Sequence, residues 1–589
     1  MSRSAKIVGW LFAAQFAALD LALRGPSAWW QSPGIAIGAI ASAALWWHAT
    51  MITSRALRVA CAILAAAILV TQAGFFRYYH VFFGVDAAGA ARFMWGDTKP
   101  MLLRIAPWLT LGTILVAGLE WLALRRAARR PTRRWGAIVA LVSCAGAFLV
   151  RGDGPPDASA LAALLRFAIP KKTTTTTSVV VPDVRTERRP AAVLLLLDES
   201  IRASDYCQAG GPDCEIAPRT AALTPDRIVF REMRSVASYT ALSVGALFTG
   251  RLPIEGQKVF ATAPMLFDVV RAIRLEGDAR PTVHYVSAQT DSFFERTDLP
   301  QVLDTFVTVK DLVGHPVDDI DDVIDAGTDR LLADRAEQKL ATLKPPFLFV
   351  AHFAGTHAPY FVDDAKAPYR PYTHAAMWSG LGELHAAYKD AIYAQDESVA
   401  RVIEAFQRAA GDAPSLVLFT SDHGESFGEH SAIHHGQDLY DEQIHVPAFA
   451  VVHHDDRAAA MRAHEGDYLT HLDVLPTIID MFGAHGAFPL RATEDPLRGR
   501  SLLRPFADGG LQILALTNCT DIFPCPVKTY GMMQGSHALT AQPWDYGWRC
   551  VDLHDDATAL DPKSPECDAL GRASHDHYPT IPCGAKNPW

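Results

Sequence analysis

The sequence predicts a membrane protein with two main parts: an N-terminal five-helix transmembrane bundle, and an α/β domain with a mostly parallel central sheet. Three observations lead to this fold class. The chain of 589 residues is 50% hydrophobic, and the apolar residues concentrate before about residue 152. After about residue 190, short apolar runs alternate with helical patterns. Most of the cysteines lie beyond the apolar region.

Five apolar stretches near the N-terminus are predicted to cross a bilayer. Each is close to the roughly 17 to 25 residues that a helix needs to span the hydrocarbon core. A cleaved signal peptide with buried core helices is the competing interpretation, but a signal peptide has one apolar region. The stretches are Ile7–Leu23, Gly34–Ile52, Ala56–Phe76, Ile105–Leu124 and Trp135–Val150.

Basic residues in the connections predict the orientation of these helices. Arg3 and Lys6 precede the first stretch, and further arginines join the second to the third and the fourth to the fifth. The positive-inside rule therefore places the N-terminus in the cytoplasm. Five crossings then carry everything after Arg151 to the periplasmic, extracytoplasmic side of the inner membrane.

Composition divides the chain into four predicted regions. A transmembrane domain covers residues 1–152, and residues 153–190 form a membrane-surface helix and linker, with "ASALAALLRFAIP" followed by "KKTTTTTS". Residues 191–510 form the α/β domain. Residues 511–589 hold five cysteines and little apolar periodicity, which predicts a loop-rich appendage stapled by disulfides.

Net charge and the positions of the cysteines limit the class of protein and its partners further. The net charge is −10, and no basic run in the soluble part suggests a nucleic-acid partner. Cys61 and Cys144 fall inside predicted spans, and the other seven cysteines lie beyond them. The close pairs in "CQAGGPDC" and "CTDIFPC" predict short disulfide loops; zinc clusters are the competing interpretation. Because seven is odd, one thiol is left free or pairs elsewhere.

Buried strands are predicted wherever a continuous apolar run appears in the α/β domain. In parallel sheets, ligands collect beyond the carboxyl ends of the strands, and polar residues stand at those ends here. The runs are "AAVLLLLDES", "PTVHYVSAQ", "PFLFVAHFAG", "SLVLFTSDHG" and "VPAFAVVHH".

The polar residues at the strand ends have the chemistry of a catalytic metal site, which needs carboxylate and imidazole ligands. A single histidine after a strand is more often structural, but four such clusters in one domain predict a site. The candidates are Glu199, His357, the group Asp422, His423 and Glu425, and the pair His434 and His435.

Several motifs resemble the alkaline phosphatase and sulfatase superfamily over residues 191–483. "TSDHGESFGEH", "LYDEQIHVPAFAVV" and "HLDVLPTIIDMFG" resemble its late core motifs, in that order. "TALSVGALFTGR" resembles the sulfatase nucleophile segment, with Thr240 in place of the family's Cys or Ser. A threonine cannot be oxidised to the formylglycine of sulfatases, so the resemblance argues against sulfate-ester cleavage.

Within the superfamily, "DESIRA" resembles the "GETxRA" motif of the membrane phosphoethanolamine transferases. This resemblance implies that Glu199, Thr240, Asp422 and His423 bind a divalent metal, with zinc favoured over manganese. It makes Thr240 the nucleophile. The catalytic histidines His357 and His435 would hold the transferred phosphoryl group or a second metal.

Some positions depart from the transferase pattern or have no clear role in it. Cysteines usually bracket the transferase nucleophile, and none does here. A two-residue shift of the frame would make Ser238 the counterpart of the nucleophile. Glu425 has a family counterpart of uncertain role, and His430 and His434 are expected to surround the site or lie at the surface. The head group therefore stays open.

The expected function is transfer of a phosphoethanolamine-type head group from a phospholipid donor to an envelope lipid or glycan acceptor, through a phosphothreonine. The alternatives are an extracytoplasmic phosphodiesterase, phosphatase or sulfatase-like hydrolase, a phosphoglycerol transferase of the lipoteichoic acid synthase type, and a domain that only binds a partner or lipid. Thr240 also fits the start of a helix, where it could cap the helix and still act as nucleophile.

Overall fold

The protein is described here by a computed structural model. Its described residues lie between 3 and 589, with gaps of one to three residues in places and nine longer gaps. The longer gaps are 127–153, 169–180, 255–262, 290–298, 487–498, 507–510, 519–524, 542–547 and 579–586.

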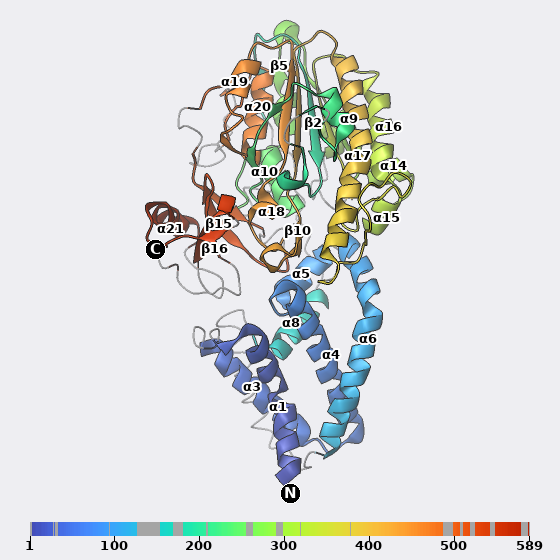
Figure 1. Cartoon of the computed structure of the whole chain (residues 1–589), viewed down its shortest axis with the longest axis vertical. Coiled ribbons are helices and arrows are strands. Elements are labelled where there is room, and N and C mark those ends of the chain that lie inside the picture. The colour runs from blue at the N-terminus through green and yellow to red at the C-terminus, as the bar shows by residue number, and fades with distance from the viewer. Residues whose placement is uncertain are drawn as a thin grey trace.

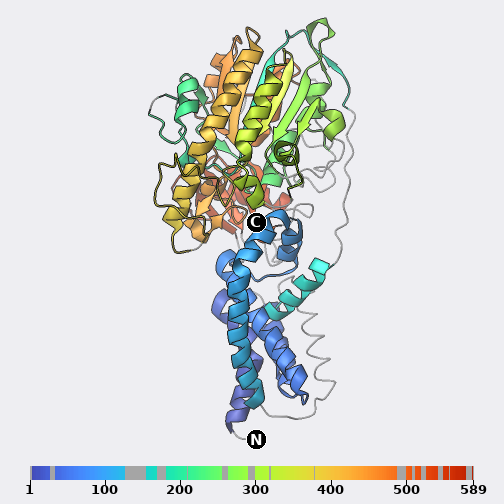
Figure 2. The ribbon, with the colours of Figure 1, turned by 90° about the vertical axis from the view of Figure 1, so that its right-hand side faces the viewer.

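The N-terminal helices lie below the α/β domain in both ribbon views (Figures 1 and 2). Three segments in the described part of the chain are long and apolar enough to cross a membrane: Lys6–Arg24, Arg55–Tyr79 and Met101–Arg126. The helices are α1 (Arg3–Arg24), α3 (Pro33–Thr50), α4 (Arg55–Tyr79), α5 (Val85–Phe93) and α6 (Trp95–Arg126).

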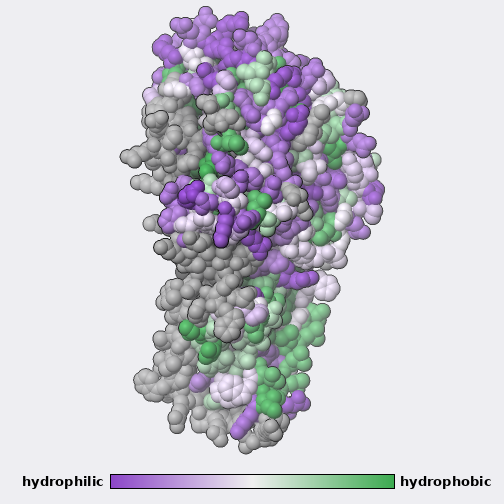
Figure 3. Space-filling view, turned by 60° about the vertical axis from the view of Figure 1, so that its left-hand side comes forward, coloured by the Kyte–Doolittle hydropathy of each residue, from purple (hydrophilic) through white to green (hydrophobic). Residues whose placement is uncertain are grey.

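Four of the five predicted spans are therefore helical, although α3, with an apolar stretch of Gly34–Thr50, is shorter than the other three. The fifth, Trp135–Val150, lies outside the described residues, so the count of five stays a prediction. Hydrophobic residues gather over these helices, whereas the exposed face of the α/β domain is mostly hydrophilic (Figure 3).

The predicted membrane-surface segment forms helix α8, Pro156–Ala168. Its buried Asp157 accepts hydrogen bonds of 2.8 Å from Ser42 Oγ and from Trp46 Nε1, both on α3. The apolar side chains Leu164 and Leu165 remain exposed. The helix is thus tied to the bundle by a polar contact and presents an apolar face outward.

A seven-stranded sheet, counted over the described residues, forms the centre of the α/β domain, in the order β3-β12-β9-β2-β8-β6-β7. The five strands from β9 to β7 run parallel, and β12 and β3 pair antiparallel at one edge. The predicted mostly parallel sheet is confirmed. The strands are β2 (Ala192–Asp198), β3 (Ile228–Val229), β6 (Thr282–Ser287), β7 (Thr305–Val307), β8 (Phe347–His352), β9 (Ser415–Ser421) and β12 (Ala448–His453).

Helices cover both faces of this sheet, which explains the continuous apolar runs of its strands. Leu194 and Leu196 of β2 pack into one core, and Val193, Leu195 and Leu197 pack into the other. Figure 1 shows α20 on one side of the sheet and α17 on the other. The covering helices are α9 (Pro218–Leu223), α16 (Thr328–Leu340) and α17 (Leu381–Ala410), and opposite them α10 (Thr240–Thr249), α12 (Leu266–Arg271) and α20 (Val474–Met481).

Short elements complete the domain. The strands are β1 (Val184–Arg185), β4 (Glu232–Arg234), β5 (Ile273–Arg274), β10 (Ser426–Phe427), β11 (Ile433–His434) and β13 (Tyr468–Thr470). The helices are α13 (Leu299–Val302), α14 (Val309–Val313), α15 (Ile320–Asp325), α18 (Asp441–Ile444) and α19 (Ala458–Arg462). The 3-10 turns are Ala203–Asp205, Glu276–Asp278, Glu429–Ser431, His471–Asp473 and Leu553–Asp555.

The C-terminal region is a folded sheet where loops were expected. Five antiparallel strands among its described residues pair in sequence order, and α21 packs on β15 and β16. Leu514, Leu516 and Met533 of this sheet pack against Val236 and Leu242 of the α/β domain. The strands are short and interrupted by glycines and turns, so their apolar alternation is weak in the sequence. The elements are β14 (Leu514–Thr517), β15 (Tyr530–Gln534), β16 (His537–Ala541), β17 (Trp548–Asp552), β18 (Thr558–Ala559) and α21 (Pro565–His577).

Disulfide bonds confirm the prediction for the described cysteines that follow the N-terminal helices. Cys207 and Cys214 are bonded, as the short loop predicts, which rules out a zinc cluster at that pair. Cys525 is also disulfide-bonded, while Cys519, its expected partner, lies outside the described residues. The bond between Cys550 and Cys567 links β17 to α21 and was not predicted.

We expect Cys550→Ser with Cys567→Ser to destabilise the C-terminal sheet by about 3 kcal/mol, because the bond closes a 17-residue separation. The measurement is thermal unfolding of the detergent-solubilised protein, followed by tryptophan fluorescence. Cys61→Ser is the control, since Cys61 is a free cysteine in the described part of the chain. Equal melting of the double variant and the control would contradict this expectation.

Candidate functional site

The ends of neighbouring parallel strands bring the predicted residues together. Glu199 directly follows β2, and Asp422 and His423 follow β9, whose register pairs Asp198 with Ser421. Across the site, Thr240 is the first residue of α10. Residues about 40 to 220 positions apart therefore meet at one edge of the sheet.

Thr240, Glu199, Asp422 and His423 form a compact cluster. The carboxylate and imidazole ligand atoms of the last three, all buried, lie within 4.8 Å of one another. His423 Nε2 lies 3.4 Å from Glu199 Oε1 and 3.3 Å from Asp422 Oδ2. Thr240 Oγ1 lies 3.0 Å from His423 Nε2 and 3.4 Å from Glu199 Oε1. The four residues could hold one ion between them.

The chemistry of this cluster fits a divalent metal. Asp422 Oδ2 is buried and accepts no hydrogen bond from the described residues, and a buried carboxylate oxygen without a partner is costly. His423 Nδ1 donates to the carbonyl of Gly424 at 2.9 Å, so its Nε2 lone pair points at the cluster. Two carboxylates, an imidazole and a hydroxyl suit zinc or manganese.

The electrostatics of the cluster point the same way. Burial, with the nearby charge of Asp422, raises the pKa of Glu199 well above its ordinary value. Burial also raises the pKa of Asp422 and lowers that of His423. The charged carboxylates are thus destabilised by the protein alone, and a divalent cation would offset that cost.

Two residues that the sequence analysis did not single out orient the carboxylates. Ser200 has a left-handed backbone, with φ of 57°; its N–H donates to Asp422 Oδ1 at 2.9 Å, and its hydroxyl donates to Glu199 Oε1 at 2.8 Å. Gln289 Nε2 donates to Glu199 Oε2 at 2.6 Å. Gln289 stands just past β6, so its position after a predicted strand was the signal that could have found it.

His357 and His435 lie beside the cluster. Each offers a ring nitrogen within 4.8 Å of a carboxylate oxygen of Glu199, in a second group of possible metal ligands. Their ring centroids are 5.5 Å apart, and that of His435 is 4.2 Å from His423. Both histidines are half-buried, whereas Glu199, Asp422 and His423 are buried, so the histidines lie on the more exposed side of the cluster.

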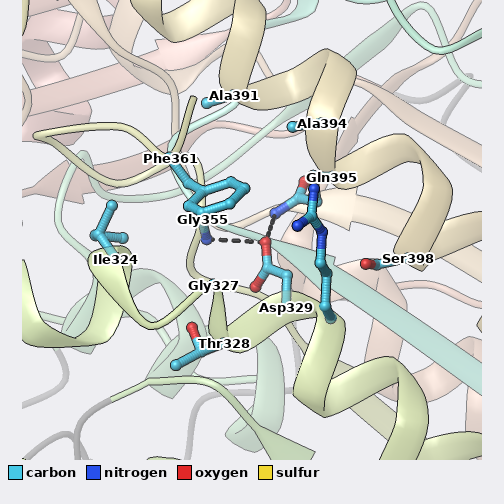
Figure 4. A pocket seen from close by; sticks show the side chains of 11 residues that line it. Ile324, Gly327, Thr328, Asp329, Gly355, Phe361, Ala391, Ala394, Gln395 and Ser398 are labelled. Carbon is cyan, nitrogen blue, oxygen red and sulfur yellow. Dashed lines mark hydrogen bonds between the residues drawn. The ribbon is translucent and has the colours of Figure 1, made fainter. Parts of the chain in front are cut away.

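The turn that carries His357 is fixed from behind by Asp329, at the start of α16. Its carboxylate accepts from the N–H of Ala354 at 2.9 Å. It also accepts from the N–H of Gly355 at 3.0 Å and from Gln395 at 2.8 Å (Figure 4). A Cβ at Gly355 would lie 2.4 Å from Asp329 Oδ2, so only glycine fits there. No motif surrounds Asp329, and only the folded chain reveals its role.

Glu425 lies on the far side of His435. It is buried, which raises its pKa to about 7 against the opposing influence of His434 and His357. Glu425 Oε1 lies 3.3 Å from His435 Nδ1 and 3.7 Å from His434 Nδ1. His430 is further out and pairs with Glu442 at 2.7 Å. His434 therefore adjoins the site, whereas His430 belongs to the surrounding ion pairs.

The structure separates the two candidate nucleophiles. The hydroxyl of Ser238 is buried and donates to the carbonyl of Asp438 at 2.5 Å, away from the metal-binding group. Thr240 faces the cluster. The capping interpretation of Thr240 is wrong, because Tyr239 is the N-cap residue and Thr240 is the first helical residue. The Thr240 side chain turns to Glu199 and His423 and leaves the backbone uncapped.

Comparison with known proteins agrees with this architecture. Residues 191–484 match the family model described as Sulfatase, about half of the chain, and this part is a sulfatase-family domain. Over these residues the chain belongs to the alkaline phosphatase and sulfatase superfamily, and it is similar to membrane phosphoethanolamine transferases.

Two curated relatives illustrate the similarity. The low-salt glycan biosynthesis sulfotransferase Agl7 of Haloferax volcanii is 29% identical over 122 residues, 20% of this chain and 30% of its own. The phosphatidylethanolamine transferase Mcr-1 of Escherichia coli is 28% identical over 143 residues, 23% of this chain and 26% of its own. This chain thus spans less than a third of either curated relative.

A solved structure extends the similarity of fold to the membrane part. The integral membrane lipooligosaccharide phosphoethanolamine transferase A of Neisseria meningitidis has a TM-score of 0.53 at 15% identity. The alignment covers 82% of this chain and 96% of that one. The similarity of fold therefore includes both the N-terminal apolar helices and the α/β domain.

Proposed function

We propose that the protein is a metal-dependent phosphotransferase that moves a phosphoethanolamine-type head group from a phospholipid to an envelope lipid or glycan. The observation that carries the proposal is the position of Thr240, whose hydroxyl oxygen lies 3.0 Å from His423 and 3.4 Å from Glu199. A threonine so placed is a nucleophile in a metal site, and it cannot become the formylglycine of a sulfatase.

The metal would be held by Glu199, Asp422, His423 and Thr240, and zinc is favoured over manganese. A divalent cation bound there lowers the pKa of the threonine hydroxyl and neutralises phosphate charge. His357 and His435 would bind the phosphoryl oxygens from the open side. The first turn of α10 adds backbone N–H groups, which favour phosphate at a helix N-terminus.

The reaction then consists of two displacements at phosphorus. Thr240 Oγ1 forms a bond to phosphorus, and the bond from phosphorus to the diacylglycerol oxygen breaks. The proton lost by Thr240 passes to that leaving oxygen, which His357 and His435 are placed to assist. An acceptor hydroxyl then attacks the phosphothreonine, releases Thr240 and returns a proton to it. The overall exchange conserves charge and protons.

The end of one predicted membrane helix contacts the α/β domain. At the end of α4, His80 Nε2 donates to the carbonyl of Ser431 at 3.0 Å, three residues before His434. We propose five spans with the α/β domain on the periplasmic side of the inner membrane. A phospholipid donor would then reach Thr240 without leaving the bilayer surface. Thiol-reagent labelling of single cysteines introduced at Lys6 and Lys563 tests this topology; equal labelling from outside would contradict it.

Mass spectrometry of envelope lipids and glycans, from cells with and without the protein, tests the transfer itself. We expect a phosphoethanolamine increment on an acceptor, together with accumulation of diacylglycerol. A phosphoglycerol increment would name the alternative head group. Release of free phosphoethanolamine without any modified acceptor would instead show a hydrolase. Unchanged lipids and glycans would contradict the proposed function.

A further inference from the structure

The C-terminal sheet reaches into the loop that carries His435. Two of its polar residues make this contact: Asn518 directly follows β14, and Thr529 directly precedes β15. Both side chains are fully buried, with 0% exposure. Buried polar side chains are retained where their hydrogen bonds are satisfied, so their partners indicate what they do.

Asn518 uses its whole amide group in this contact. Its Nδ2 donates to the carbonyl of Gly436 at 2.7 Å and to that of Val527 at 2.8 Å. Its Oδ1 accepts from the N–H of Thr529 at 2.8 Å. An asparagine amide has two N–H donors. Here one donates to Val527, in the segment before β15, and the other donates to Gly436, the residue after His435.

Thr529 holds the next position of the same loop. Its hydroxyl donates to the carbonyl of Gln437 at 2.7 Å. Two consecutive carbonyls after His435, those of Gly436 and Gln437, are therefore held by the C-terminal sheet. Leu516 and Leu439 pack in one apolar cluster beside these bonds, so the contact is desolvated.

The loop needs this support because its backbone is strained. His434 has a left-handed backbone, with φ of 66°, and Gly436 has φ of 75°. Left-handed conformations of residues other than glycine persist only where surrounding contacts hold them. The imidazole of His435 stands between these two positions, and its place beside Glu199 and His423 follows from the path of the loop.

We propose that Asn518 and Thr529 are positioning residues that act through His435, so that the C-terminal sheet is part of the phosphate-binding site. The proposal rests on the function proposed above in one respect, the role of His435 as a phosphate ligand. Shifts of about 1 Å in a positioned group can cost about 100-fold in rate. Loss of the two hydrogen bonds at the base of the loop could therefore displace His435 enough to weaken its contact with phosphate.

The test uses full-length, zinc-loaded protein in detergent, with inorganic phosphate as the probe. Thr529→Val removes one hydroxyl and keeps the shape of the side chain. Thr540→Val is the matched control, because the Thr540 hydroxyl, on β16 of the same sheet, is buried and finds no partner in the described residues. Calorimetry gives the phosphate affinity, and elemental analysis gives the zinc content.

We expect Thr529→Val to weaken phosphate binding about tenfold with zinc content unchanged, and Thr540→Val to bind phosphate as the unmodified protein does. Asn518→Asp is expected to weaken it more, because a carboxylate oxygen would then face the carbonyl of Gly436. A double-mutant cycle with His435→Ala gives the deciding readout. In the His435→Ala background, Thr529→Val should change the affinity less than twofold.

Three results would overturn the proposal: unchanged binding by Thr529→Val, an equal loss in Thr540→Val, or the same tenfold loss with and without His435. The last would mean that Thr529 supports the sheet generally. A failure of the proposed function looks different. If the double-mutant cycle shows coupling between Thr529 and His435 but lipids and glycans in cells are unmodified, the head-group transfer is rejected. The positioning role of Thr529 is then still supported.

Discussion

Thr240→Ala is expected to lower head-group transfer by at least about 10³-fold, because it removes the attacking oxygen that begins the reaction. Zinc content should stay near that of the unmodified protein, since Glu199, Asp422 and His423 remain as ligands. The measurement is transfer from a labelled phospholipid in detergent micelles, paired with elemental analysis. Thr240→Ser should recover part of the activity, because it restores a hydroxyl at the same position.

Ser238→Ala is the matched control for Thr240→Ala. Ser238 lies two residues earlier, carries a hydroxyl and is buried, but its hydrogen bond goes to the carbonyl of Asp438. Loss of that bond should cost about 1 kcal/mol of stability and leave most of the transfer. Full activity in Thr240→Ala, or loss of activity in Ser238→Ala alone, would move the nucleophile away from Thr240.

Glu199→Gln is expected to remove the bound metal, with a fall in activity to the level of a chelated sample. Glu199 contributes ligand atoms to both possible metal groups. The amide of the glutamine would remove one of the few carboxylates that can balance the charge of the cation. Elemental analysis after dialysis measures the metal directly. Added zinc should restore activity to the chelated unmodified protein and leave Glu199→Gln inactive.

The adjacent carboxylate provides the control for this loss. Asp198 is also buried, and burial with the charges of Asp329 and Asp422 raises its pKa well above the ordinary value. Asp198 belongs to neither possible metal group in the described part of the chain. We therefore expect the metal to stay bound in Asp198→Asn. If Asp198→Asn lost the metal while Glu199→Gln kept it, the assignment of ligands after β2 would be reversed.

Much of the fold was predictable because its strands and helices produce local patterns of apolar residues in the sequence. Continuous apolar runs indicated the five strands that form most of the central sheet, since a strand covered on both faces needs apolar side chains at every position. The long apolar helices of the N-terminal part were equally clear, and helix α8 was expected at its observed place. The C-terminal sheet was not, because short strands broken by turns carry little periodicity.

The candidate site was predictable where its residues sit in recognisable motifs. Glu199, Asp422 and His423 follow apolar strands, and the resemblance to a known superfamily drew Thr240 into the same group. Gln289, Asp329 and Asn518 stand in no such motif. Their hydrogen bonds to Glu199, to the turn before His357 and to the loop of His435 exist only in the folded chain.

The sequence by itself therefore determined the class of protein, the strands of the sheet and the residue types that can bind a metal. Those properties depend on local apolar patterns and on side-chain chemistry, which are readable one segment at a time. Only the tertiary structure decided that Thr240 and not Ser238 faces Glu199 and His423, and that the C-terminal sheet forms hydrogen bonds to the loop of His435. Both depend on distances between segments that are far apart in the chain, and packing alone sets such distances.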